Sequence, residues 1–331
     1  MPENDGAARP ESQDPEAPLL ADVSPDVTAA VSEFMAEAAV QNEAEAELAG
    51  EESSFTAGAG LAAADFASSP GPYIAFEHVY KSFGDFRVLE DVSFAVNPGE
   101  TLCILGRSGV GKSVSLQILM GFLKADRGTV MVAGQDIAGF TEREMQAVRR
   151  KVTMVFQNGA LFDSITVGEN VAFPLRERGD MEEDQILQVV KGLLEMVGVA
   201  GMEDLLPSDL STGMKRSVAI ARALAAQPAA VLYDEPTTMV DPLMGHLLGN
   251  LIQRLKAQLH LTSLVVTHDM RFAEKLADRV LFLHEGRARF FGTMEEMRMS
   301  EDPVLQEFLE LDQLVLPGVE RVSLGTGSGA T

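Results

Sequence analysis

The chain has 331 residues, 46% of them apolar, a net charge of −24 and one cysteine, Cys103. This length allows one large α/β domain or two small ones, and a single cysteine excludes an internal disulfide. The acidic balance argues against nucleic acid as a partner, because nucleic-acid binding needs clustered Lys and Arg. No apolar run approaches the length that crosses a bilayer, so we expect any membrane-spanning partner to be another chain.

Residues 1–72 contain fifteen acidic residues against one basic residue, Arg9. Few of the side chains are large and apolar, so burial cannot offset the entropy of ordering this segment. The composition predicts a mostly disordered, solvated extension. An alternative for residues 27–48 is a weak amphipathic helix, whose apolar face would hold Val27, Val31, Phe34, Met35 and Ala38. Residues 316–331 are predicted to form a flexible tail.

From about residue 73 to 315, strand-like and helix-like patterns alternate, which predicts an α/β domain with a mainly parallel sheet between helices. Several predicted strands are short apolar runs, as expected of strands covered on both faces; the strands are 74–79, 101–105, 152–156, 230–233, 263–267 and 280–284. The predicted helices are 112–122, 142–150, 184–197, 212–226 and 243–259. Residues 158–226 are mostly helical and predict a subdomain beside the sheet.

A glycine-rich loop joins the predicted strand 101–105 to the next helix. It matches the phosphate-binding pattern G-x-x-x-x-G-K-[ST], with residues Gly106, Arg107, Ser108, Gly109, Val110, Gly111, Lys112 and Ser113. Glycines let successive backbone N–H groups point at phosphate oxygens, and the helix adds its positive N-terminal end. We expect Lys112 to reach the β- and γ-phosphates of ATP and the Ser113 hydroxyl to ligate Mg²⁺. An incidental glycine-rich turn is the alternative, which the flanking strand and helix disfavour.

Two acids, Asp234 and Glu235, follow the apolar strand 230–233. Beside bound phosphates, Asp234 would hold Mg²⁺ through water, and Glu235 would polarise the attacking water as the general base. Acids often follow strands merely to begin a helix, so this pattern is weak alone. Together with the glycine-rich loop it indicates a hydrolytic site.

His268 and Gln157 lie at the ends of two other predicted strands. His268 could donate a hydrogen bond to the γ-phosphate, although a surface histidine with its own partner is the usual alternative. Gln157 could contact Mg²⁺ or the attacking water, but a single glutamine carries little information.

A short segment before the predicted helix 212–226 resembles the L-S-G-G-Q signature of ATP-binding cassette (ABC) proteins. It reads Leu210, Ser211, Thr212, Gly213 and Met214. Ser211 and the following N–H groups would open the helix, so that its positive end faces an anion. An ordinary serine N-cap is the alternative.

The order of these motifs along the chain identifies it as a member of the ABC family. The resemblance implies a P-loop NTPase fold with an N-terminal antiparallel β region and a helical subdomain, and ATP hydrolysis with Mg²⁺. It also implies that Phe83, 23 residues before Gly106, stacks on adenine, and that Asp241, followed by Pro242, belongs to a loop that signals across a dimer.

In this family two copies hold ATP between the P-loop of one and the signature of the other, so the resemblance implies a homodimer. Ser211, Thr212 and Gly213 would then cap a γ-phosphate bound by the partner copy. The family has glycine where this chain has Thr212. A β-branched side chain limits close backbone approach there, so turnover could differ.

Shorter segments are similar to the ATPases of Mla/Mce-associated transporters, which move phospholipid between bacterial membranes. They are 156–163 (FQNGALFD), 170–177 (NVAFPLRE), 301–303 (EDP) and 306–309 (QEFL). This resemblance implies a location on the cytoplasmic face of the bacterial inner membrane. It also implies a multi-span permease that contacts residues 158–177, and an Mce-type lipid-binding subunit.

For these shorter segments and for the function, alternatives remain open at this level. Residues 160–162 and Phe173 could simply fill the core of the helical subdomain, and the transporter could instead import amino acids or metals. A nucleotide-gated regulator with little hydrolysis is a further alternative, which Thr212 mildly favours. A soluble ABC protein of translation or DNA repair is the last alternative, but those usually carry two cassettes or long coiled-coil insertions.

Overall fold

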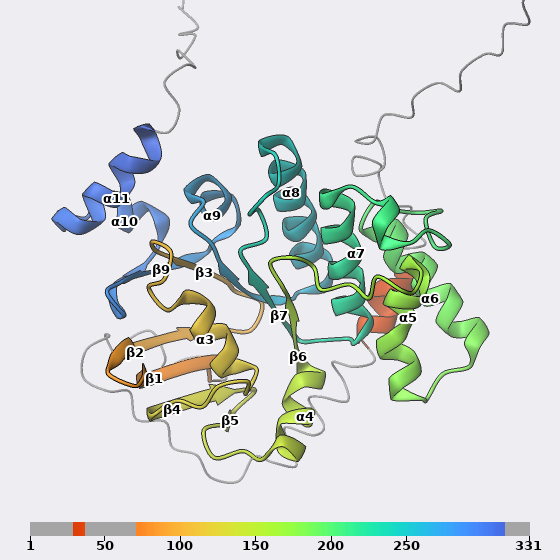
Figure 1. Cartoon of the computed structure of the whole chain (residues 1–331), viewed down its shortest axis with the longest axis horizontal. Coiled ribbons are helices and arrows are strands. Elements are labelled where there is room, and N and C mark those ends of the chain that lie inside the picture. Colours follow the sequence, from red (N-terminus) through yellow and green to blue (C-terminus); the bar gives the residue numbers. More distant parts are fainter. Residues whose placement is uncertain (1–28, 37–70, 315–331) are drawn as a thin grey trace, which may run out of the picture.

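The computed structural model describes residues 29–36 and 71–314, which form two sheets with helices around them (Figure 1). Within these described residues, no helix is long and apolar enough to cross a membrane. The larger sheet has the strand order β10-β9-β3-β8-β7-β6, and every pair in it is parallel except β10 with β9. Its strands are β3 (Thr101–Leu105), β6 (Val152–Val155), β7 (Ala230–Asp234), β8 (Thr262–Val266), β9 (Arg279–His284) and β10 (Arg287–Gly292).

The larger sheet is covered on both faces, which explains its continuous apolar strands. In β3, the buried side chains of Leu102 and Ile104 join one core cluster, and those of Cys103 and Leu105 join the other. The expectation that Cys103 is a core residue is confirmed, and burial raises the pKa of its thiol.

The smaller sheet is antiparallel, in the order β2-β1-β4-β5, and confirms the β region implied by the family resemblance. Its strands are β1 (Ile74–Phe83), β2 (Phe86–Val96), β4 (Arg127–Val132) and β5 (Gln135–Asp136). The predicted strand 74–79 is therefore too short. Register shifts along the β1–β2 pair interrupt the alternation that would have marked the rest.

Helices flank the sheets, and three of them form the helical subdomain at one end of the molecule (Figure 1). The subdomain contains α5 (Val167–Arg178), α6 (Glu183–Met196), the 3₁₀ turn η1 (Pro207–Asp209) and α7 (Thr212–Ala225). The other helices are α3 (Lys112–Leu119), α4 (Glu142–Lys151), α8 (Pro242–Leu259), α9 (Met270–Leu276), α10 (Met294–Met299) and α11 (Pro303–Leu314).

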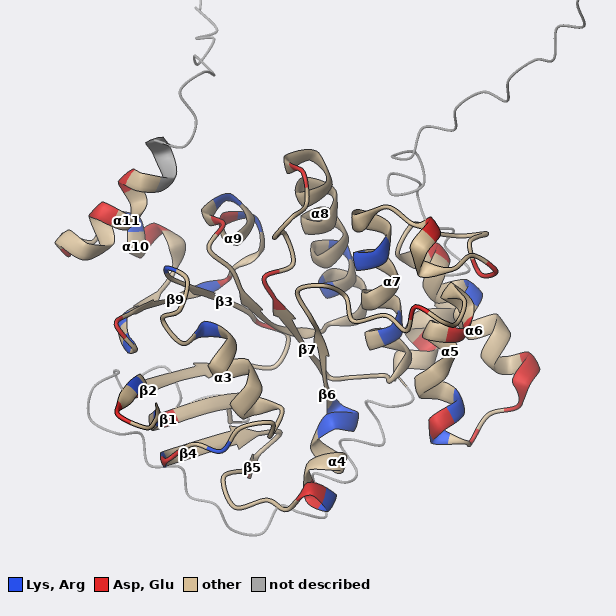
Figure 2. Ribbon diagram, in the orientation of Figure 1, with Lys and Arg blue, Asp and Glu red and all other residues tan. Residues whose placement is uncertain are grey.

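Local chemistry sets the ends of these helices. The predicted helix 112–122 ends early, at Leu119, because Gly121 has a φ of +68° and the Met145 side chain fills the space beside it. In α4, Thr141 forms a capping box, and the acidic first turn and basic last turn match the helix dipole (Figure 2).

Residues 29–36 form a helix that packs on the helical subdomain, which corrects the expectation of a solvated tail over this short stretch. Val31, Phe34 and Met35 are buried in the core cluster that also holds the subdomain. The Gln227 amide donates to the Phe34 carbonyl, and the Arg178 guanidinium lies 5.9 Å from the centroid of the Phe34 ring. The remaining residues of the predicted 27–48 helix, including Val27 and Ala38, lie outside the described residues.

Candidate nucleotide-binding site

Glycines determine the shape of the loop between β3 and α3. Gly106, Gly109 and Gly111 have φ angles of +150°, +82° and +103°, which residues with a Cβ rarely adopt. Space requires glycine at two of them: a Cβ on Gly106 would collide with the Leu283 carbonyl oxygen, and a Cβ on Gly111 with that of Val88. Strands β9 and β2 therefore hold the loop in one shape.

Lys112 begins α3 and is buried, with a side-chain exposure of 5%. Its ammonium group donates to the carbonyl oxygens of Gly106 (2.9 Å) and Arg107 (3.2 Å), and lies 3.3 Å from Glu235 Oε1. A buried ammonium needs such partners, and phosphate oxygens would supply charged acceptors. By contrast, the Arg107 side chain points away from the site to an ion pair with Glu307 of α11, at 2.7 Å. Arg107 therefore contributes its backbone carbonyl to the site, as a partner of Lys112, and not its side chain.

Ser113 and Asp234 meet where β7 ends beside α3. Ser113 Oγ donates to Asp234 Oδ1 at 2.8 Å. Burial raises the pKa of the Asp234 carboxyl, and the hydrogen bond from Ser113 acts in the opposite direction. Hydroxyl and carboxylate oxygens are hard donors of the kind Mg²⁺ prefers, and this ion commonly uses one or two carboxylates together with substrate phosphates. Ser113 and Asp234 therefore fit their predicted role as ligands of Mg²⁺.

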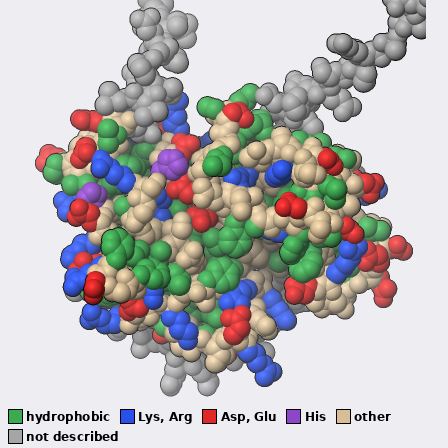
Figure 3. Space-filling model, in the orientation of Figure 1, with side chains coloured by type: hydrophobic (Ala, Val, Ile, Leu, Met, Phe, Trp, Pro, Cys, Tyr) green, Lys and Arg blue, Asp and Glu red, His purple; other side chains and the backbone are tan. Residues whose placement is uncertain are grey.

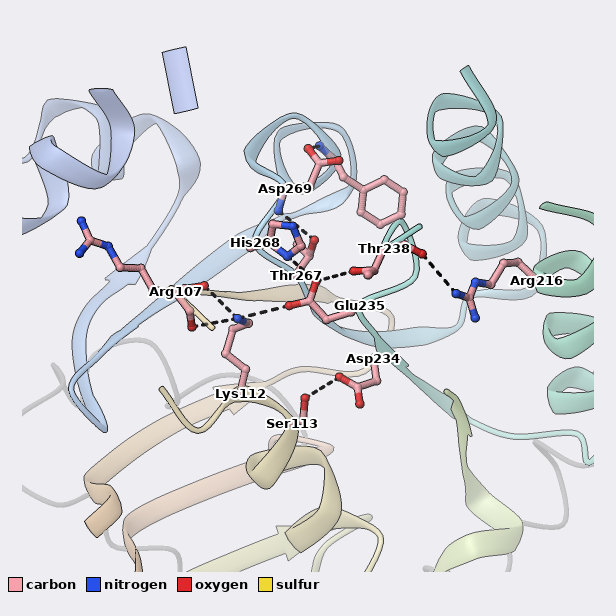
Figure 4. A network of polar contacts seen from close by, with 12 residues as sticks. Arg107, Lys112, Ser113, Arg216, Asp234, Glu235, Thr238, Thr267, His268 and Asp269 are labelled. Carbon is pink, nitrogen blue, oxygen red and sulfur yellow. Dashed lines mark hydrogen bonds and ion pairs between the residues drawn. The ribbon is translucent and has the colours of Figure 1, made fainter. Parts of the chain in front are cut away.

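Glu235 is the centre of a polar network that joins four elements (Figure 4). Its φ of +46° is uncommon for a residue with a side chain, and its N–H donates to the Val266 carbonyl at 2.9 Å. The carboxylate accepts a hydrogen bond from Thr238 Oγ1 at 3.3 Å and lies 2.7 Å from His268 Nδ1. Lys112, Thr238 and His268 therefore hold the carboxylate from three directions.

The structure brings together Lys112, Ser113, Asp234, Glu235 and His268, all at the carboxyl edge of the parallel strands. This is the edge at which α/β folds place ligands. His268 is half-exposed, and its partner is the Glu235 carboxylate. The structure therefore gives His268 a partner of its own at this edge of the sheet, and the predicted hydrogen bond to a γ-phosphate stays a prediction.

Gln157 and Phe83 lie at the border of this group. Gln157 follows β6, the strand beside β7, and is exposed; it makes no hydrogen bond within the described residues. Phe83 ends β1 with a side-chain exposure of 48%, and the Lys81 ammonium lies 5.5 Å from its ring centroid. Phe86, across the hairpin, is also exposed. Figure 3 shows hydrophobic side chains gathered on this face over the antiparallel sheet.

The signature segment lies at the start of α7, where Ser211 is the N-cap and accepts a hydrogen bond from the Met214 N–H at 3.3 Å. Thr212 is exposed at the first helical position. Asp241 caps α8 in the same way, accepting from the N–H groups of Leu243 and Met244. Within the described residues, none of these groups hydrogen-bonds to the glycine-rich loop, as expected if a second copy completes the site.

Two residues of the network were not predicted from the sequence. Thr238 donates to Glu235, and Arg216 donates to the Thr238 carbonyl (Figure 4). Neither matches a motif. For Arg216, the available signal was a charged residue on the mostly apolar buried face of α7.

The glycine-rich loop, its lysine and the paired acids define a P-loop ATPase site on an α/β fold. A family model described as ABC transporter matches residues 89–238. Together with the relatives below, this shows that the chain belongs to the ABC transporter family, as its ATP-binding, ATP-hydrolysing subunit.

Three relatives show how far the likeness extends. The chloroplastic protein TRIGALACTOSYLDIACYLGLYCEROL 3 of Arabidopsis thaliana is 40% identical over 251 residues, covering 70% of this chain and 71% of the relative. The intermembrane phospholipid transport system ATP-binding protein MlaF of Haemophilus influenzae is 38% identical over 227 residues, covering 69% and 86%. The methionine import ATP-binding protein MetN of Rhizobium johnstonii is 41% identical over 209 residues, covering 63% and 58%.

Among solved structures, a dimeric ATP-binding cassette in a post-hydrolysis state, bound to ADP and phosphate, is similar. Its TM-score is 0.62 at 30% identity, and the match covers 67% of this chain and 98% of that one. The ABC nucleotide-binding domain fold is therefore established for this chain.

Proposed function

We propose that this chain powers phospholipid transport between bacterial membranes, from the cytoplasmic face of the inner membrane. The observation that carries the proposal is the 38% identity to MlaF, a phospholipid transport ATP-binding protein, over 86% of its length. The likeness to MetN favours a second candidate, an amino-acid importer, but this chain covers only 58% of that relative.

The proposed mechanism uses two copies of the chain around two ATP molecules. Phe83 stacks on adenine, and the backbone of residues 106–111 and Lys112 bind the phosphates. Ser211, Thr212 and Gly213 of the other copy cap the γ-phosphate, and Asp241 lies at the contact between copies. Met239, two residues before Asp241, is 91% exposed, so a second copy at this contact would cover its apolar side chain.

Hydrolysis depends on Glu235, which acts as the base toward the attacking water, with His268 hydrogen-bonded to the same carboxylate. In the structure Lys112 pairs with Glu235. A triphosphate competes for the lysine and leaves the carboxylate for the water. Ser113 and Asp234, with Gln157, would hold Mg²⁺, which neutralises phosphate charge. Loss of the γ-phosphate contacts reopens the dimer and drives the membrane subunits.

An exposed aromatic pair supports permease docking at residues 158–177. Phe162 and Phe173 have exposures of 45% and 43%, and their ring centroids are 5.0 Å apart. Asn170, fully buried, exchanges hydrogen bonds with the backbone of Phe162 and so holds the segment in place. Because these two rings lie at the surface, core filling does not account for them, and a membrane partner could cover them.

Reconstitution tests the proposed function. The full-length chain, co-expressed with its permease and an Mce-type subunit, should support ATP-dependent transfer of fluorescent phospholipid between vesicles. ATP-driven uptake of methionine without lipid transfer would contradict the proposal and favour the importer.

Co-purification tests the docking surface. The Phe162→Ala/Phe173→Ala double variant should lose most of the co-purified permease, because exposed aromatic anchors dominate such interfaces. The matched control is Leu187→Ala, which changes an exposed apolar residue of α6. Equal recovery of permease with both variants would place the contact elsewhere.

A further inference from the structure

Arg216, in the second turn of α7, is a buried cation without a carboxylate partner in the described part of the chain. Its side chain is 4% exposed. Nη1 donates to the Phe156 carbonyl and Nη2 to the Thr238 carbonyl, both at 3.3 Å, while Nε has no hydrogen-bond partner. Burial lowers the pKa of this guanidinium.

Such an arrangement is costly for stability. A buried guanidinium loses its hydration, and two neutral carbonyls at 3.3 Å replace only part of it. An apolar residue of similar size would commonly be neutral or stabilising at such a position. Folding alone therefore does not explain an arginine here.

The two carbonyls that Arg216 binds belong to the loops that border the hydrolytic site. Phe156 directly precedes Gln157, at the end of β6. Thr238 lies in the loop that follows Glu235, and its hydroxyl donates to the Glu235 carboxylate. Figure 4 shows this path, which runs from Lys112 through Glu235 and Thr238 to Arg216 on α7.

Two further contacts hold α7 in place, one to the segment after β6 and one to α8. Arg222, one and a half turns further along α7, donates to the carbonyls of Gly159 (3.0 Å) and Ala160 (2.8 Å). At the start of the helix, the Met244 side chain fills the space over Gly213, so that a Cβ there would collide with it. The signature helix therefore contacts the segment after β6 through two arginines, the loop after β7 through Arg216, and α8 through Gly213.

We propose that Arg216 is a positioning residue that couples occupancy of the γ-phosphate site to the orientation of the signature helix in the same subunit. When a triphosphate draws Lys112 away from Glu235, the carboxylate and Thr238 shift together. The guanidinium transmits that shift to α7, whose Ser211–Gly213 end serves the site of the other copy. This inference rests on the proposed dimer and on the role of Glu235.

The test is steady-state phosphate release by full-length Arg216→Met, which keeps an unbranched, mostly aliphatic side chain and removes the charge and the donors. We expect kcat to fall by about tenfold or more, with the Kd for a fluorescent ATP analogue within about twofold of the parent. The thermal midpoint should stay equal or rise, because an unpaired buried charge is removed. Arg216→Lys keeps the charge and one hydrogen bond, and should recover part of kcat. Lys191→Met, an exposed residue of α6, is the matched control.

Two outcomes would overturn the proposal: a parental kcat for Arg216→Met, or a loss of kcat that parallels a lowered thermal midpoint, as a merely structural residue would give. A double-mutant cycle with Thr238→Val adds a second readout. If both residues act on one path, the double variant should lose no more kcat than Arg216→Met alone; additive losses would contradict the path. Failure of the parent chain to bind nucleotide would instead contradict the proposed function.

Discussion

At the scale of single residues, the nucleotide site depends on two glycines and four side chains that the ends of β3 and β7 and the start of α3 bring together. Gly106 and Gly111 lie where a Cβ does not fit, and Lys112, Ser113, Asp234 and Glu235 converge as their motifs predict. The sequence could not reveal Arg216, because its partners are backbone carbonyls of two loops that lie far from it in the chain. Contacts of this kind depend on the tertiary fold and not on residue type.

Lys112 should be required for nucleotide binding. In Lys112→Ala, the affinity for a fluorescent ATP analogue should fall about 10- to 100-fold, because a charged hydrogen bond to phosphate is lost. The matched control is Lys124→Ala, which removes an exposed lysine just after α3 and should bind as the parent does. Unchanged affinity in Lys112→Ala would contradict the role assigned to this lysine.

At the scale of elements, the parallel strands and the long amphipathic helices were predictable, because short apolar runs and the 3.6-residue period mark them. The sequence did not predict strand β2, most of the antiparallel sheet, or helices α9 to α11. The β1–β2 pair contains register shifts, which break the alternation of buried and exposed side chains. In α7, the N-cap Ser211 was recognised, and the substitution of threonine for glycine at position 212 remains the main departure from the family pattern.

Thr212→Gly should raise turnover. Removing the β-branched side chain lets the start of α7 approach the γ-phosphate of the other copy more closely. We expect kcat to rise by about two- to tenfold, with a small loss of helix stability of about 0.5 kcal/mol. The measurement is phosphate release with saturating Mg-ATP. A kcat equal to or below that of the parent would show that Thr212 does not hinder the closed dimer.

At the scale of the whole molecule, one short segment of the acidic extension packs on the cassette. Its residues 29–36 pack on the helical subdomain through Val31, Phe34 and Met35. The sequence pattern over 27–48 indicated a weak amphipathic helix only as an alternative to a solvated tail, and nothing in it indicated a docking surface; of this range, the structure describes a helix over residues 29–36. That surface, near Arg178 and Gln227, exists only once α5 and α7 are packed together.

Phe34→Ala should undock this helix and destabilise the subdomain. Truncation of a buried aromatic side chain in a core typically lowers the free energy of unfolding by about 3–5 kcal/mol. Here we expect a smaller loss, because only a short segment undocks. We expect the thermal midpoint to fall by a few degrees, roughly 2–4 °C per kcal/mol, with faster hydrogen exchange in residues 29–36, α5 and α7. Glu33→Gln, an exposed change on the same helix, is the control. Exchange rates equal to those of the parent would contradict the docking.

The most direct test of the account is the behaviour of full-length Glu235→Gln with Mg-ATP. Because the amide keeps the shape of the side chain but cannot act as a base, we predict that the variant binds ATP, accumulates as a dimer in size-exclusion chromatography, and loses turnover by about 10²-fold or more. Hydrolysis at the parental rate, measured as phosphate release in the same sample, would contradict the proposal that Glu235 activates the attacking water.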